Sequence, residues 1–159
     1  MKFSAQEEYG LRCLLRIGKA HSQNGLTIPE ISEMEGLSIA NAGKLLRALR
    51  LGGFIESTRG QSGGYRLARS ADEIIIGNVL AVLGGKLFEA GFCEIHAGTE
   101  RICTNSIDCS IRSLWGMVQN VVDNILNKLT LKDLLGKEEE VKVLVKLFVD
   151  ESDSQAVKN

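Results

Sequence analysis

Three cysteines near the middle of the chain, Cys93, Cys103 and Cys109, are the residues whose type and spacing best suit chemistry. Nine residues separate the first two and five separate the last two, within the polar stretch FCEIHAGTERICTNSIDCS. Clustered thiols in a chain that we expect to be intracellular are more often ligands of a metal or a metal cluster than disulfide partners. The sequence therefore predicts an inorganic site in this stretch.

The spacing of the cysteines bears on what they hold. Thiolates are soft ligands that suit iron–sulfur clusters, Cu(I) and zinc, but structural zinc favours tighter Cys-x2–4-Cys pairs. The wider spacing favours a loop around a larger core, with zinc or a disulfide plus one free thiol as alternatives. Clusters usually take four protein ligands, and His96 and Asp108 are candidates inside the loop. Cys13 lies among apolar residues of the first predicted helix, where we expect a buried structural thiol.

Several classes of protein are disfavoured by the sequence. The N-terminal stretch has no uninterrupted apolar core and carries Glu7 and Glu8, so we expect no signal peptide. No apolar run approaches the length that spans a bilayer, and we expect a cytoplasmic protein. The turn RGQSGG at 59–64 lacks the Lys-Ser/Thr of a Walker loop. With no convincing Ser/His/Asp set and no paired acid–base motif either, we expect no enzyme.

The net charge of −1 hides an asymmetry between the two halves of the chain. Residues 1–70 hold ten Lys/Arg against six Asp/Glu, whereas residues 71–159 hold nine against fourteen. Within 41–70, six basic residues accompany one acid, Glu56. Such a density of positive charge is typical of a surface that binds phosphates. The segment is therefore expected to meet a polyanion.

The N-terminal part carries a winged helix-turn-helix pattern. Apolar spacing predicts a first helix over 5–20, and Thr27-Ile-Pro-Glu30 is a capping box that begins a short helix. Ser38 caps a third helix, IANAGKLLRALRLGG, and strands over 54–57 and 65–67 flank the turn RGQSGG. We expect a mainly α fold with a small β wing and a winged helix-turn-helix domain over 1–70.

The third helix is the predicted recognition helix, since the N-terminal residues of such helices face base edges. Asn can pair with adenine and Lys can favour guanine, while arginines farther along reach phosphates. An arginine in the wing turn is suited to a narrow minor groove. We expect these residues to contact double-stranded operator DNA: Ser38, Ala40, Asn41, Lys44, Arg47, Arg50, Arg59, Gly60 and Gln61.

The second half of the chain is expected to contain a connecting helix, the cysteine loop and a segment that forms the dimer. A connecting helix lies within 71–91, the cysteine loop covers 92–110 and a dimerisation segment covers 111–135. A long helix over 110–129 has one apolar stripe, which favours a homodimer; its residues are Leu114, Val118, Val121, Val122, Ile125 and Leu129. The C-terminal tail, 136–159, is ambiguous between helix and strand, with a loose end over the last eight residues.

Together these marks resemble the Rrf-type family of winged-helix transcription regulators, which includes iron–sulfur regulators of the IscR, NsrR and RirA types. The resemblance covers about residues 1–135. It rests on MKFSAQEEYGLRCL, IPEISEMEGLS, LLRALRLGGFIESTRGQSGGYRLAR, the three cysteines and CSIRSLW…LTLKDLL. It implies a dimeric regulator whose operator binding depends on a 2Fe–2S or 4Fe–4S cluster. The signal implied is iron or cluster status, nitric oxide or an oxidant.

The resemblance also implies a fourth ligand. Relatives that regulate cluster assembly use a His three residues past the last cysteine, where this chain has Arg112, which cannot bind metal. Relatives that sense nitric oxide use an acidic residue of the partner subunit, which corresponds to Glu8. At Gly43 the cluster-assembly relatives carry a glutamate, so their operator preference does not transfer. The alternatives are a thiol-based or partner-regulated regulator of sulfur metabolism without a cluster, and a zinc-stabilised interaction module.

Overall fold

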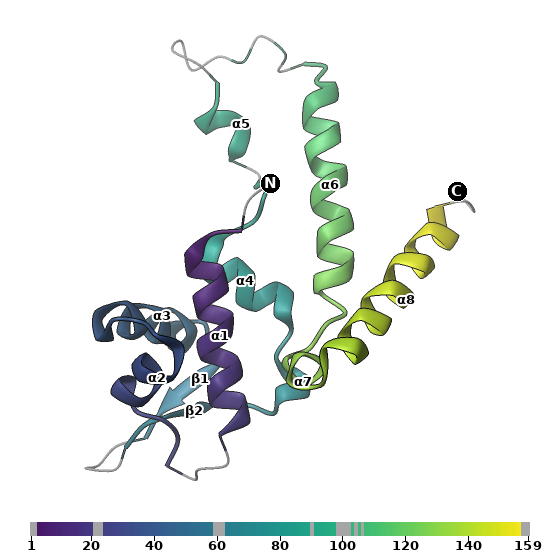
Figure 1. Cartoon of the computed structure of the whole chain (residues 1–159). Coiled ribbons are helices and arrows are strands. Elements are labelled where there is room, and N and C mark those ends of the chain that lie inside the picture. Colours follow the sequence, from purple (N-terminus) through teal and green to yellow (C-terminus); the bar gives the residue numbers. More distant parts are fainter. Residues whose placement is uncertain are drawn as a thin grey trace.

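The fold is a winged-helix body from which two long helices extend (Figure 1). The computed structural model describes residues 3–20, 24–58, 63–89, 91–97, 103, 105 and 107–156. The elements are α1 (Ala5–Lys19), α2 (Ile28–Glu35), α3 (Ile39–Leu51), β1 (Ile55–Ser57), β2 (Tyr65–Leu67), the 3-10 turn η1 (Ala71–Glu73), α4 (Ile76–Gly84), α5 (Phe92–Ile95), α6 (Ser110–Leu126), α7 (Leu131–Leu135) and α8 (Glu138–Ala156). The predicted mainly α fold with a small β wing is confirmed.

The helix boundaries follow from local caps. The Thr27 hydroxyl accepts a hydrogen bond from the Glu30 amide, and the Glu30 carboxylate accepts one from the Thr27 amide at 2.7 Å. Gly36 ends α2 in the left-handed region at φ 64°, which favours glycine. Ser38 caps α3 by accepting from the Asn41 amide at 3.2 Å. The predicted starts of α2 and α3 are therefore confirmed.

The core lies where α1, α3 and α4 meet, and α7 returns to it. Its fully buried side chains come from these elements, from α2 and β1, and from the segment before α4; the largest are Leu14, Ile31, Leu45, Leu46, Leu49, Ile55, Ile74, Leu131 and Val79. The Ile76 amide donates to the Leu129 carbonyl at 2.9 Å, and the Leu131 amide donates to the Ile74 carbonyl at 2.8 Å. These hydrogen bonds join the segment that follows α6 to the start of α4.

One residue of the predicted dimerisation stripe lies elsewhere. We expected the long helix to run to Leu129, but α6 ends at Leu126. Leu129 is only 5% exposed and belongs to the core of the winged-helix body. The apolar spacing continued past the end of the helix because the chain turns inward there, so Leu129 serves the fold rather than a partner.

The wing is an antiparallel pair of strands with a close third neighbour. Strands β1 and β2 pair Ile55 with Leu67 and Ser57 with Tyr65. Tyr65 also pairs with Leu26, through hydrogen bonds of 3.0 and 2.7 Å between their backbones. A Cβ on Gly64 would lie 2.8 Å from the Leu26 backbone, so this crossing requires glycine. The start of the wing is thus held against the segment that leads into α2.

A buried carboxylate joins α1 to the helix-turn-helix. Glu35 at the end of α2 is 8% exposed, and its two oxygens accept from Arg12 Nε at 2.8 Å and Arg16 Nε at 2.7 Å. Burial alone would raise the pKa of Glu35, but the hydrogen bonds and charges of Arg16 and Arg12 outweigh it and hold the pKa below its ordinary value. The carboxylate therefore contributes stability that is fully present above about pH 4.5 and is lost as the pH falls through the lowered pKa.

We expect Glu35→Gln to lower the free energy of unfolding at pH 7 by about 2 kcal/mol, since a charged, buried acceptor is replaced by a neutral one. The difference from wild type should shrink as the pH falls below 4. Urea unfolding at pH 7 and pH 3.5 measures both values. Glu33→Gln, at an exposed position of the same helix, is the control and should change neither. A loss that is the same at both pH values would contradict the assigned role of the charge.

The C-terminal tail is a helix rather than a strand. Helix α8 runs from Glu138 to Ala156 and diverges from α6 (Figure 1). Its inner face packs Val145 and Phe148 against the core, and Lys128 Nζ lies 5.3 Å from the Phe148 ring centre. Since the helix continues to Ala156, the loose end predicted over the last eight residues is wrong up to that point. Within the described segments, no helix is both long and apolar enough to cross a membrane.

Candidate metal centre and nucleic-acid interface

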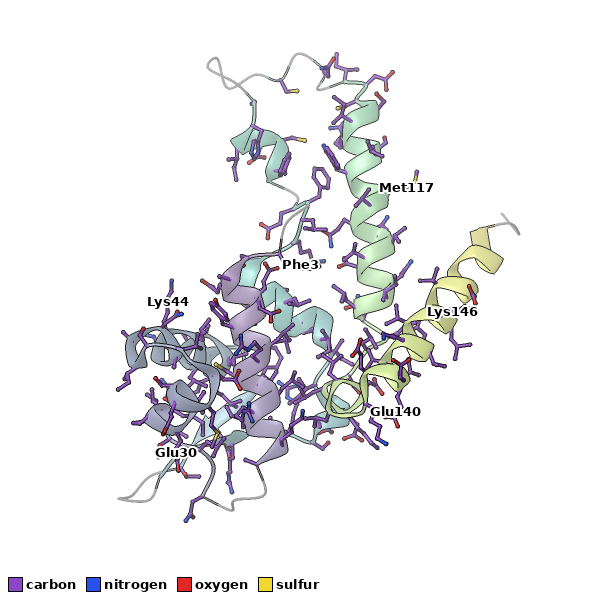
Figure 2. The ribbon with its side chains drawn as sticks, viewed as in Figure 1. Phe3, Glu30, Lys44, Met117, Glu140 and Lys146 are labelled. Carbon is purple, nitrogen blue, oxygen red and sulfur yellow. The ribbon has the colours of Figure 1, made fainter. Side chains whose placement is uncertain are left out.

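The outward face of α3 is basic and open. Its inward face buries Ala42, Leu45, Leu46 and Leu49, so the positions between them must face solvent. Lys44, Arg47 and Arg50 are exposed, and Lys44 projects outward from α3 (Figure 2). Their spacing of three residues places these cations along one side of the helix.

The start of α3 is open as well. Ser38 and Ala40 are exposed and Asn41 is half-buried. The Ser38 hydroxyl accepts from the Asn41 amide, which leaves its own hydrogen free to donate elsewhere. The structure thus brings six of the nine residues predicted to contact DNA onto one helix. The other three, Arg59, Gly60 and Gln61, lie outside the described residues.

The wing stem is ordered by its own contacts up to the turn. Glu56 and Arg66 face each other across the strands at 2.7 Å. The Thr58 hydroxyl accepts from the Gly64 amide at 2.9 Å and lies 2.9 Å from the Asn24 carbonyl. These bonds close the two strands just before the turn, which fixes where the wing begins beside α3.

The three cysteines border one hollow at the far end of α6. Cys109 is the N-cap of α6, Cys93 lies on the short helix α5 and Cys103 lies between them. All three are free and half-buried. The hollow has a volume of about 180 Å³; its other lining residues are Phe88, Phe92, His96, Asn105, Ile111, Arg112 and Trp115. We had placed all three cysteines in a loop, but the structure puts Cys93 on a helical turn.

The donor set and the walls of the hollow fit a thiolate-bound inorganic core. The Cys109 sulfur accepts a hydrogen bond from the Arg112 amide at 3.3 Å, and the N-terminus of a helix stabilises negative charge. Phe88, Phe92 and Trp115 give the hollow an apolar side. In the part of the chain that the structure describes, no three Cys, His, Asp or Glu side chains converge as a ready-made metal site. Holding a core would therefore need the loop to draw its thiols inward.

The candidates for a fourth ligand differ in where they lie. His96 lines the hollow, its ring stacks on Phe92 at 4.0 Å between ring centres, and its Nδ1 lies 2.8 Å from the Phe92 carbonyl. A carbonyl only accepts, so this contact requires the proton on Nδ1, and the neutral ring then has its lone pair on Nε2. Asp108 is exposed and does not line the hollow. Glu8 is exposed on the first turn of α1 and also lies outside the hollow of its own chain.

Cys13 is separate from this site. It is fully buried in the core, and burial, reinforced by the charge of Glu35, raises the pKa of its thiol to about 11. A buried thiol with a raised pKa is a poor ligand and a poor nucleophile. The prediction of a buried Cys13 is confirmed.

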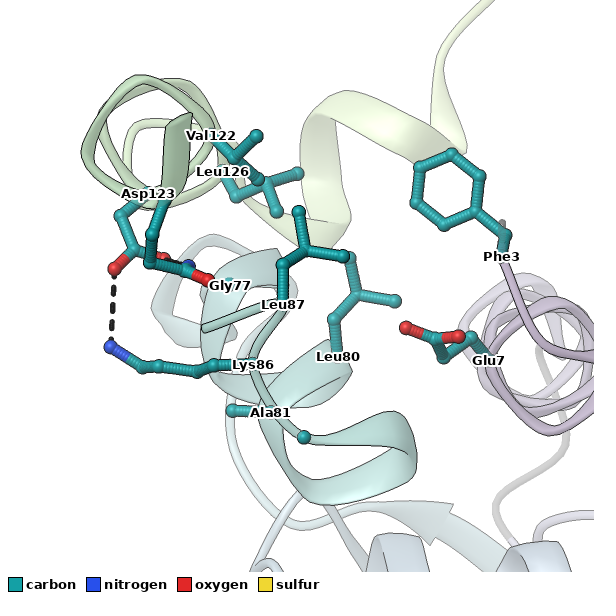
Figure 3. A pocket seen from close by; sticks show the side chains of 12 residues that line it. Phe3, Glu7, Gly77, Leu80, Ala81, Lys86, Leu87, Val122, Asp123 and Leu126 are labelled. Atoms are coloured by element: carbon teal, nitrogen blue, oxygen red, sulfur yellow. Dashed lines mark hydrogen bonds and ion pairs between the residues drawn. The ribbon is translucent and has the colours of Figure 1, made fainter. Parts of the chain in front are cut away.

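A second hollow lies between the first turn of α1, α4 and α6 (Figure 3). Its walls are largely apolar, with Phe3, Leu80 and Leu87 among them, and a Lys86–Asp123 ion pair of 3.1 Å lies beside it. Glu7 also borders it, but its carboxylate accepts from the Ser4 amide in the cap of α1. Sequence reasoning missed this hollow and the buried Gln119 beside it; the signal was a polar residue beside the apolar stripe of α6.

Comparisons with known proteins agree with the winged-helix fold. The profile of the Rrf2 family, described as an iron-dependent transcriptional regulator, matches residues 3–137. Protein rrf2 of Nitratidesulfovibrio vulgaris is 34% identical over 136 residues, covering 85% of this chain and 87% of its own. The structure of IscR from T. potens is similar with a TM-score of 0.65 at 28% identity, covering 85% of this chain and 86% of its own.

A further neighbour is CymR (YrzC), the global cysteine regulator of B. subtilis. Its structure gives a TM-score of 0.63 at 26% identity, covering 85% of this chain and 96% of its own. CymR is thus described as a regulator. Helix α8 lies beyond the family match, which ends at residue 137.

Proposed function

This chain belongs to the Rrf2 family of transcriptional regulators, and we propose that it is a dimeric regulator whose operator binding is controlled by an iron–sulfur cluster on Cys93, Cys103 and Cys109. The observation that carries the proposal is that three free cysteines, from α5, the start of α6 and the segment between them, border one hollow. The elements that carry Cys93 and Cys109, α5 and the start of α6, lie at the end of α6 opposite the winged-helix body (Figure 1). The protein would act in the cytoplasm, where thiols stay reduced.

The roles of the residues follow from their positions. Cys93 and Cys109 would hold the core from α5 and α6, and Cys103 from the segment between them. When bound, either a 2Fe–2S or a 4Fe–4S cluster supplies iron that responds to nitric oxide, oxidants or iron supply. Phe92 and Trp115 would exclude water from the thiolates, which protects them from oxidation.

A homodimer is supported by the face that α6 leaves uncovered. Regulators of this family bind operator DNA and are typically dimers. Large apolar side chains along α6 are at least 43% exposed: Ile111, Leu114, Trp115, Met117 and Val121. Met117 projects from the side of α6 that faces away from α5 (Figure 2). A second copy that covers this helix would also place two recognition helices for a two-fold operator.

We expect two kinds of defect from substitutions in α3. Asn41→Ala should reduce discrimination between operator and random DNA, because amide contacts read base edges. Arg47→Ala should weaken binding to both DNAs alike and lower the salt dependence by about one unit of slope, because one phosphate contact is lost. Binding titrations on both DNAs at several salt concentrations measure the two effects. Equal losses on both DNAs for Asn41→Ala would refute its assigned role.

Glu8 from the partner subunit is the proposed fourth ligand. Its carboxylate is exposed and makes no hydrogen bond or ion pair with any side chain in the described part of its own chain, so it is free to reach another subunit. We expect Glu8→Ala to form a cluster that decays several-fold faster in air, since one iron loses its protein ligand. The loss of absorbance after exposure to air measures this. His96→Ala is the matched variant: faster decay there, with Glu8→Ala unchanged, would assign the ligand to His96.

The proposal is tested by purifying the protein without air and measuring its absorption, iron and sulfide. We expect a brown protein with broad absorption above about 300 nm and iron and sulfide in equal amounts. Zinc in place of iron, with no visible absorption, would favour a zinc-stabilised module and contradict the proposal.

A second candidate function is thiol-based regulation without a cluster. It is favoured by the similarity to CymR and by the free, half-buried state of the three cysteines. In that case, the protein would bind operator DNA without metal, and oxidation of the thiols would change its affinity. Colourless protein whose operator binding is altered by peroxide and restored by a reductant would establish it.

A further inference from the structure

Gln119 is a buried amide whose two ends are both bound. It is 8% exposed on α6. Its Oε1 accepts from the Phe88 backbone amide at 2.9 Å, and its Nε2 donates to Asp123 Oδ1 at 2.8 Å. The other oxygen of Asp123 accepts from Lys86 Nζ at 3.1 Å (Figure 3). Because one neighbour can only donate and the other can only accept, the orientation of the amide is determined.

These contacts tie together the two sides of the cysteine hollow. Lys86 and Phe88 belong to the segment that leads into α5, which carries Cys93. Gln119 and Asp123 lie one turn apart on α6, whose N-cap is Cys109. Helix α5 itself has only four residues, which is too short for a helix to be stable on its own. Its position therefore depends on what anchors the chain before it.

Ring contacts continue the connection from Phe88 to the thiols. The Phe88 and Phe92 ring centres are 5.3 Å apart, and Phe92 stacks on His96 at 4.0 Å. Phe92 is next to Cys93 in sequence, and the rings of Phe88 and Phe92 both line the hollow. A shift of the Phe88 backbone would thus move Phe92 and Cys93 with it.

We propose that Gln119 is a positioning residue that sets the distance between the Cys93 and Cys109 sulfurs. Removal of a buried partner leaves the Phe88 amide unsatisfied, which costs about 1–3 kcal/mol. The chain can avoid that cost by moving the Phe88 segment toward water and away from α6. The distance between the two sulfurs can be tested without any cluster. That Gln119 thereby prepares the three thiols to hold one core rests on the proposed function.

Cross-linking of the cluster-free protein tests the distance directly. In a Cys103→Ala background, dibromobimane joins Cys93 to Cys109 within one chain and becomes fluorescent, while the buried Cys13 does not react. We expect Gln119→Met, which keeps the shape and removes both hydrogen bonds, to slow this reaction about tenfold. Asn124→Leu, at an exposed position of the same helix, should leave the rate unchanged. The pair Gln119→Glu with Asp123→Asn keeps one amide and one carboxylate and should restore most of the rate.

Equal cross-linking rates in the parent and in Gln119→Met would overturn the proposal. The proposal would also be overturned if the double variant Gln119→Glu with Asp123→Asn cross-linked as slowly as Gln119→Met while its thermal midpoint matched that of the parent. Iron and sulfide loading of proteins with all three cysteines separates this proposal from the proposed function. If the wild type loads no iron but Gln119→Met still slows cross-linking, the positioning role stands and the cluster function fails. If the wild type loads iron and Gln119→Met does not slow cross-linking, the cluster function stands and the positioning role fails.

Discussion

Replacement of Cys93, Cys103 or Cys109 by Ala is expected to abolish the visible absorption of the anaerobically purified protein and leave its fold intact. Three thiolates with one weaker ligand provide no spare donor, so each loss leaves an iron without an adequate set of ligands. The fold should survive because the core is formed by α1 to α4, β1 and α7, and none of the three cysteines belongs to it. Iron, sulfide and absorbance measure the first effect, and circular dichroism with thermal unfolding measures the second.

Cys13→Ala is the control for these variants. It removes a fully buried sulfur from the core, so we expect it to lower stability by about 1–2 kcal/mol while the cluster stays. Full iron and sulfide in all three single variants of the hollow would contradict the ligand assignment. A colourless Cys13→Ala protein that unfolds normally would instead place Cys13 at the metal.

Gly25→Ala is expected to be among the most damaging single changes in the DNA-binding half of the chain. Gly25 has φ 77°, and a Cβ there would collide with the carbonyl of Tyr65. Relief of that collision requires breaking the paired hydrogen bonds between Leu26 and Tyr65. The strained φ costs about 1–2 kcal/mol and each lost bond about 1 kcal/mol, so we expect a loss of about 3 kcal/mol or more. Urea unfolding measures it.

Gly36→Ala separates the two causes. Gly36 also has a positive φ, 64°, but a Cβ there would have no neighbour within 4 Å. It should therefore show the backbone cost alone, about 1 kcal/mol. Gly25→Ala should also weaken DNA binding, because the wing loses its attachment to the segment before α2, whereas Gly36→Ala should not. Equal destabilisation by the two changes would contradict the role of the Leu26–Tyr65 contact.

The sequence was most informative where structure is determined by neighbouring residues. The capping box of Thr27 and Glu30, the stop at Gly36 and the cap at Ser38 act within four residues, so each could be predicted from the letters alone. The hairpin was equally local, since glycines and a polar turn separate two short apolar strands. These features locate the recognition helix, and with it most of the DNA-contacting residues predicted here.

Features that depend on distant contacts could not be predicted. Glu35 looks like one acid among several in IPEISEME, and only the fold brings Arg12 and Arg16 to it. Leu129 continues the apolar rhythm of α6, but the chain turns inward before it. The valine-rich tail has the composition of either a strand or a helix; α8 forms with Val145 and Phe148 packed against the core.

At the cysteine site too, the local features could be predicted from the sequence and those that depend on distant contacts could not. Residue type and spacing identified the three thiols, because soft ligands are recognisable without a fold. The helical turn at Cys93, the aromatic wall and the amide of Gln119 depend on how α5 lies against α6, which no local pattern encodes. The fourth ligand is harder still, because Glu8 would act only in a second copy.

The central claim is that cluster occupancy controls DNA binding, and one binding measurement tests it most directly. DNA fragments would first be selected from a random pool with anaerobically reconstituted protein. The affinity for one selected fragment is then measured at a single salt concentration, for cluster-loaded and cluster-free wild type and for Cys103→Ala. We predict at least a tenfold difference between the two wild-type forms, about 1.4 kcal/mol, with Cys103→Ala matching the cluster-free form. Equal affinity of the loaded and cluster-free wild type would contradict the account.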